Sequence, residues 1–68
     1  MTHEELRRIR AELGLGVPDF ARRLGLDDTH GHAKRKMVRL LNGGERISGP
    51  IAVAARALLR LRQAGVSL

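Results

Sequence analysis

The sequence predicts an all-α fold, a single small domain of four helices, or of five if the turn at residues 27–32 contains a short helix of its own. Apolar residues recur every three or four positions in four segments, which is the period of a helix with one buried face. A glycine follows each of these segments, at Gly14, Gly25, Gly43 and Gly65, and glycine is the commonest residue after a helix end. A chain of 68 residues is near the lower limit of unaided folding, so residues 1–68 are expected to form one domain that association would stabilise.

The first predicted helix covers about residues 3–13. Thr2 followed by Glu5 has the spacing of a capping box, and Gly14 supplies the stop. Apolar residues at helical spacing form the inward face: Leu6, Ile9 and Leu13. The outer face is expected to carry three arginines: Arg7, Arg8 and Arg10.

The second predicted helix is short and begins within residues 16–19, where Pro18 and Asp19 suit a first helical turn. Phe20, Ala21 and Leu24 are expected to face the core, and Gly25 ends the helix. A stretch rich in turn formers follows at residues 27–32. The third helix therefore begins near Ala33, or as early as Asp28 if Gly31 lies inside it at a cost of roughly 1 kcal/mol.

The third predicted helix, about residues 33–42, combines an apolar stripe with a basic outer face. At about 100° per residue, the apolar side carries Ala33, Met37, Leu40 and Leu41. The opposite side carries Lys34, Arg35, Val38, Arg39 and Asn42. A helix anchored to a core with a basic outer face has the size and charge to enter a DNA major groove, although a solvated charged face is the alternative.

The fourth predicted helix begins at residues 48–50 and extends to about Ala64. One apolar stripe faces the core: Ile51, Ala54, Ala55, Leu58 and Leu61. Further apolar residues lie on neighbouring faces: Val53, Ala57, Leu59 and Ala64. This surplus predicts a homodimer in which two copies of the helix pack around a two-fold axis, and a deep core position for the helix is the alternative.

Thirteen Lys and Arg against seven Asp and Glu give a formal net charge of +6, which favours a polyanionic partner. With one Phe and no Trp or Tyr, the chain lacks stacking platforms for single strands or RNA, so double-stranded DNA is the expected partner. The apolar-rich run at residues 50–61 is interrupted by Arg56 and Arg60 and is too short to span a membrane. The absence of Cys excludes disulfides and thiolate zinc sites, and together with the lack of a signal peptide it predicts a cytoplasmic protein.

His30 and His32 are a weak signal for a metal site because no Cys or clear third ligand accompanies them. A role for these residues in the turn or at the helix start is the favoured interpretation, so no metal is expected. A pair of nucleophile and base is also missing from the pattern, and a chain of this length offers little room for a substrate pocket. The sequence therefore predicts a binding protein without cofactor and not an enzyme.

The string Phe20-Ala21-Arg22-Arg23-Leu24-Gly25-Leu26 resembles the first half of the helix-turn-helix in the Cro and phage-repressor (Xre-like) family. Residues 5–10 and 13–15 are similar to that family's first helix, and residues 44–50 are similar to the loop before its closing helix. The resemblance covers most of the chain and implies a lambda-repressor-like helix-turn-helix domain. Three departures are a longer turn after Gly25, Gly16-Val17 in place of a polar pair often containing Gln, and Leu41 at the usual position of a Trp.

The resemblance implies a sequence-specific transcriptional regulator, expected to be a repressor that binds two half-sites about one helical turn apart as a dimer. Very small regulators of this type are common in phages and mobile elements. The expected base-reading residues are Lys34, Arg35, Val38 and Arg39. The expected phosphate contacts are Arg22, Arg23, Lys36, Asn42, Arg46 and, at the start of the helix, His32.

Two other functions fit the same sequence. A protein-interaction module, such as an antitoxin or adaptor, would use the apolar fourth helix and would tolerate the loss of Arg35 or Arg39. A nonspecific architectural DNA binder would show a steep salt dependence with little preference among sequences, because phosphate contacts carry no sequence information.

Overall fold

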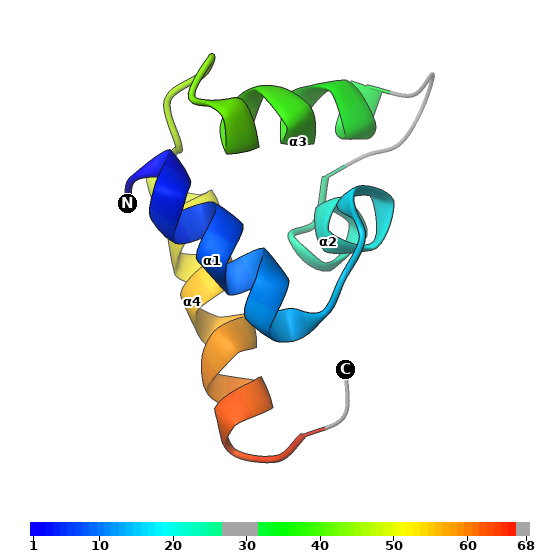
Figure 1. Cartoon of the computed structure of the whole chain (residues 1–68), viewed down its shortest axis with the longest axis vertical. Helices are drawn as coiled ribbons and strands as arrows, with labels where there is room; N and C mark the ends of the chain where they lie inside the picture. The colour runs from blue at the N-terminus through cyan, green and yellow to red at the C-terminus, as the bar shows by residue number, and fades with distance from the viewer. Residues whose placement is uncertain (27–31, 67–68) are drawn as a thin grey trace.

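The structure is a computed structural model that describes residues 1–26 and 32–66. In this part of the chain it contains four helices and no strand, which confirms the predicted all-α fold (Figure 1). The helices are α1 (His3–Leu13), α2 (Val17–Arg23), α3 (His32–Asn42) and α4 (Gly49–Gln63). The alternative start of α3 at Asp28 and a short additional helix in the turn lie outside the described residues.

Helix α1 has the boundaries and the N-terminal cap that the sequence predicts. The Thr2 hydroxyl oxygen accepts a hydrogen bond of 3.1 Å from the Glu5 backbone N–H. Gly14 ends the helix in the left-handed region, with φ of 68°, a conformation that costs an L-residue with a side chain about 1–2 kcal/mol. The Glu5 carboxylate also accepts a hydrogen bond of 3.3 Å from Arg56 Nη2, which links α1 to α4.

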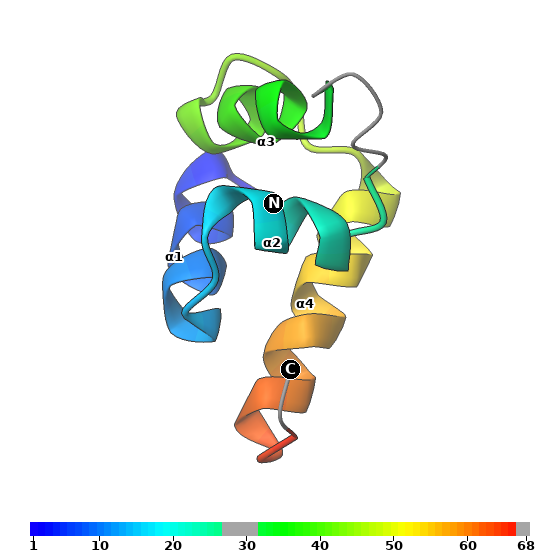
Figure 2. The same cartoon turned by 90° about the vertical axis from the view of Figure 1, so that its right-hand side faces the viewer.

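The core is built from the apolar faces of all four helices. Helix α3 packs against α1 and α2, and α4 packs against α1. In the views of Figures 1 and 2, α3 therefore lies across the top of the other helices. The largest fully buried side chains are Phe20, Leu6, Met37 and Leu40. All four residues predicted for the apolar side of α3 are buried, so the orientation of this helix about its own axis is confirmed.

One face of helix α4 is buried along its first half, and residues 60–63 at its C-terminal end are exposed. Ile51, Ala52 and Ala55 are buried, whereas Leu61 is 43% exposed. The prediction that Leu61 belongs to the core stripe is therefore wrong. In Figures 1 and 2 the C-terminal end of α4 extends beyond the ends of α1 and α2, so this end of the helix has fewer neighbours than its start.

Two of the three arginines expected on the outer face of α1 reach back to the backbone. Arg10 is half-buried, and its Nη1 donates a hydrogen bond of 3.1 Å to the Leu15 carbonyl. Arg7 is exposed, and its Nη1 donates a hydrogen bond of 3.0 Å to the carbonyl of Leu41 in the last turn of α3. The last four carbonyls of a helix have no partner within it, so Arg7 satisfies one of them and ties α1 to α3.

Candidate nucleic-acid interface

The candidate interface is the outer face of α3. It points away from the core because the opposite face of the helix is buried. Lys34, Arg35, Val38 and Arg39 are all exposed, as the helical period predicts. At about 100° per residue, Arg35 and Arg39 lie one turn apart near the middle of the exposed arc. Lys34 and Val38 lie on one side of them, and Lys36 lies on the other side.

A shallow hollow of about 370 Å³ follows this face of α3. Its lining residues recur at the three- and four-residue spacing of one helix face: His32, Arg35, Lys36 and Arg39. Three of these side chains are permanently cationic at neutral pH. The hollow therefore presents closely spaced positive charges beside a helix, an arrangement that attracts an anionic ligand.

Glu45, in the loop between α3 and α4, lies at one side of this basic face. One of its carboxylate oxygens, Oε2, accepts a hydrogen bond of 2.8 Å from Lys36 Nζ. The other oxygen, Oε1, lies 3.5 Å from Arg39 Nε. The hydrogen bond from Lys36, aided by the charges of Lys36 and Arg39, holds the pKa of Glu45 below its ordinary value.

Glu45 is not among the site residues that the sequence predicts. Helical periodicity identifies neighbours three or four positions apart, but Lys36 and Glu45 are nine positions apart and separated by a glycine turn. Lys36 is predicted to contact phosphate, but in the structure it pairs with the carboxylate of Glu45. The Lys36 side chain is 40% exposed.

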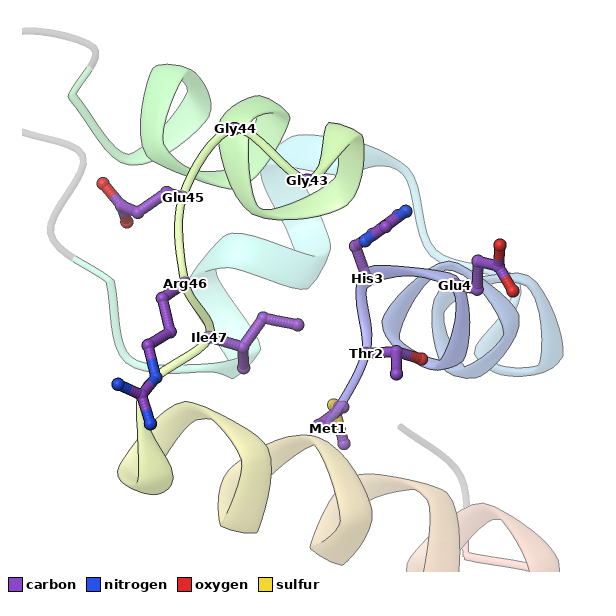
Figure 3. Close-up of a pocket in the computed structure, with 9 residues that line it drawn as sticks. All are labelled: Met1, Thr2, His3, Glu4, Gly43, Gly44, Glu45, Arg46 and Ile47. Atoms are coloured by element: carbon purple, nitrogen blue, oxygen red, sulfur yellow. The ribbon is translucent and has the colours of Figure 1, made fainter.

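The other predicted phosphate contacts lie at the ends of helices or in the loop. Arg22 and Arg23 are exposed in the last turn of α2, where Arg22 forms an ion pair with Asp19. Asn42 is exposed at the end of α3. Arg46 is exposed in the α3–α4 loop, and its side chain extends away from His3 in Figure 3.

A second hollow, of about 550 Å³, lies between the start of α1 and the α3–α4 loop (Figure 3). His3 lies at its wall beside Gly43, close enough that a Cβ on Gly43 would be 3.0 Å from His3 Nδ1. Gly43 also has a φ of 81°. The Gly44 N–H donates a hydrogen bond of 2.9 Å to the Arg39 carbonyl, so the loop that carries Glu45 is fixed to the end of α3.

The residues predicted for a dimer interface on α4 have unequal exposure. Val53 is 67% exposed, and Ala57 and Ala64 are also exposed. Leu59 is half-buried and packs against the core of its own chain. Leu59 therefore contributes to the fold of the monomer, and Val53, Ala57 and Ala64 remain as the accessible part of the predicted interface.

Among residues 1–26 and 32–66, no group of three or more His, Cys, Asp or Glu side chains is placed to hold a metal ion. His30, the other member of the histidine pair, lies outside the described residues. None of the helices in the described part of the chain is long and apolar enough to cross a membrane.

Comparisons with known proteins found no match. No protein-family model matches this chain, and searches of the curated proteins and of the solved structures returned no match.

Proposed function

We propose that this protein binds double-stranded DNA as a sequence-specific transcriptional regulator, with α3 in the major groove. The observation that carries the proposal is the exposed basic face of α3 on a helix whose opposite face is buried in the core. The major groove, about 12 Å wide, admits one α-helix of about 10–12 Å diameter. The net charge of +6 favours the approach to a polyanion.

The exposed side chains of α3 have the chemistry for reading base edges. Arg35 and Arg39 can each donate two hydrogen bonds to guanine O6 and N7, and the methyl groups of Val38 can contact a thymine methyl. Lys34 on the flank supplies a further donor to a base or a phosphate. The resemblance to the Cro and phage-repressor family supports this assignment, because that family reads DNA with the corresponding helix.

A two-fold dimer would place two copies of α3 on successive major grooves, about 34–36 Å apart. The exposed apolar residues of α4 support such an assembly, with Val53 as the most exposed large one. Repression of transcription would then follow from occupancy of an inverted repeat that overlaps a promoter.

The direct test of the surface compares Arg35→Ala with Arg8→Ala. Both residues are exposed arginines within helices, and both substitutions remove one positive charge, but Arg8 lies on α1 beside the hollow formed with α4. Fluorescence anisotropy with a labelled duplex of mixed sequence should show a severalfold loss of affinity for Arg35→Ala and a near wild-type affinity for Arg8→Ala. Equal affinities for the two variants would contradict the assignment of α3.

A protein-interaction module is the second candidate, and the exposure of Val53, Leu61 and Val66 favours it. In that case Val53→Asp would abolish capture of the protein partner, whereas Arg35→Ala would have little effect. Arg35→Ala therefore separates the two functions, because it weakens binding to DNA in the first case and leaves capture of a protein partner intact in the second.

A further inference from the structure

Glu45 is an acidic residue that lies against the basic face of α3. Its carboxylate is 30% exposed and contacts two cations that lie one turn apart on α3, Lys36 and Arg39. An ion pair at a solvent-exposed site contributes little to stability. Its position within the proposed DNA-facing surface means that Glu45 changes how Lys36 and Arg39 are presented to DNA.

The backbone around Glu45 fixes its carboxylate relative to α3. The positive φ of Gly43, the close approach of His3 to Gly43, and the bond from Gly44 N–H to Arg39 O define the path of the loop. The carboxylate thus lies beside Lys36 and Arg39 because the turn places it there.

The contact with Arg39 is made through Nε, which lies 3.5 Å from Glu45 Oε1. The two terminal nitrogens of the Arg39 guanidinium remain at the far end of the side chain, where their N–H groups form the fork that pairs with guanine O6 and N7. At the same time, Lys36 is neutralised by Glu45, so a DNA phosphate must compete with a carboxylate for this lysine.

We propose that Glu45 is a specificity-determining positioning residue: its carboxylate orients Arg39 for base contact and withholds Lys36 from phosphates of arbitrary sequence. This inference rests on the proposed function of α3. On this proposal, Lys36 would add affinity for any duplex, whereas Arg39 discriminates among bases. Glu45 weakens the contribution of Lys36 and supports that of Arg39.

The test uses Glu45→Gln with Glu12→Gln as the matched control, since both substitutions raise the net charge by one and Glu12 is exposed on α1 beside α4. Binding to a mixed-sequence duplex is measured between about 50 and 200 mM salt. Each phosphate neutralised adds about 0.9 to the slope of log K against log salt, so Glu45→Gln should steepen the slope by about 0.9 and Glu12→Gln should leave it unchanged. The preference of Glu45→Gln for a selected site over mixed sequence should fall severalfold.

The inference about Glu45 would be overturned if Glu45→Gln and Glu12→Gln had the same salt slope and the same preference for the selected site. The proposed function would survive that result if wild-type protein still bound DNA and still depended on Arg35. If wild-type protein bound no duplex, the proposed function and the inference would fail together. NMR spectra of the free protein provide a separate check, because the Arg39 Nε–H and Lys36 ammonium signals should shift in Glu45→Gln and stay in place in Glu12→Gln. Unchanged signals would show that the contacts with Glu45 are not formed.

Discussion

Arg7 and Arg8 are neighbours on α1, carry the same charge and are both exposed, but they have different surroundings. Arg7 donates to the Leu41 carbonyl at the end of α3, whereas Arg8 lines the hollow between α1 and α4. The difference arises because a helix presents successive residues about 100° apart, so that one of the two points toward α3.

Arg7→Ala should therefore lower the free energy of unfolding by about 1–2 kcal/mol, because it removes a charge-assisted hydrogen bond to a helix-end carbonyl. Arg8→Ala should change it by less than about 0.5 kcal/mol, as is usual for a surface substitution. Urea unfolding followed by circular dichroism measures both. Equal stabilities of the two variants would show that the bond to Leu41 contributes nothing.

Glu45 gives a prediction about pH. Its pKa is lowered in the folded protein, chiefly by the hydrogen bond from Lys36, so the folded state gains stability while the carboxylate is charged. That gain is present above the ordinary pKa of 4.5 and is lost as the pH falls below it through the lowered value. Wild-type protein should therefore lose more stability than Glu45→Gln between neutral pH and the acid range, as measured by the urea midpoint. Parallel pH curves for the two proteins would contradict the contact with Lys36.

The environment of a residue could be predicted from the sequence where burial repeats with the helical period. Ala33, Met37, Leu40 and Leu41 were assigned to the buried face of α3 correctly, because burial along one helix repeats with the helical turn. The contacts of Glu45 with α3 and of Arg7 with Leu41 depend on how separate segments meet in space. No spacing within one segment contains that information.

At the scale of the elements, glycines and caps allowed the helix boundaries to be predicted closely, and the extent of packing was harder to predict. Helix α4 shows the difference, since its start near residues 48–50 was predicted correctly but Leu61 was assigned to the core. Apolar periodicity continues along α4 past the point where α1 and α2 end. The sequence therefore indicated which face is apolar, but not how much of that face has a neighbouring helix.

The turn after α3 contains Gly43 and fixes the position of the loop that carries Glu45 in the proposed interface. Gly43→Ala would place a side chain at a positive φ and bring its Cβ to 3.0 Å from His3 Nδ1. The strain of the left-handed conformation alone costs about 1–2 kcal/mol, and the contact with His3 adds to it. Gly14→Ala is the matched control, because Gly14 also has a positive φ but has open space around it.

Thermal or urea unfolding should thus show a larger loss of stability for Gly43→Ala than for Gly14→Ala. The additional His3→Ala substitution should recover part of the loss in Gly43→Ala, since it removes the ring that the new methyl group approaches. Equal losses for the two glycine variants would show that the His3 contact does not constrain the turn.

At the scale of the whole molecule, the proposed DNA-binding surface and the exposed apolar residues lie on different helices. In Figure 1, α3 lies at one end of the molecule and α4 extends beyond the other helices toward the opposite end. This separation allows one chain to contact DNA and a second copy at the same time. The surplus of apolar residues on α4 predicts a homodimer, and Val53 is the most exposed large apolar residue of this helix.

Val53→Asp should leave the helical circular dichroism signal intact, because an exposed residue contributes little to the monomer fold, and should convert a dimer to a monomer. Ala11→Asp, at an exposed position on α1, introduces the same charge away from α4 and should leave the dimer unchanged. Sedimentation equilibrium measures the mass of each protein. Monomeric wild-type protein at the concentrations that saturate DNA would contradict the dimer.

Selection from a randomised duplex pool with the purified protein tests directly whether α3 reads DNA sequence. The selection is carried out at about 150 mM salt, where weak nonspecific binding is suppressed. We expect enrichment of an inverted repeat whose half-sites are centred about 10 base pairs apart, and loss of that enrichment in Arg35→Ala. Recovery of duplexes without any common sequence, or the same enrichment with Arg35→Ala, would contradict this expectation.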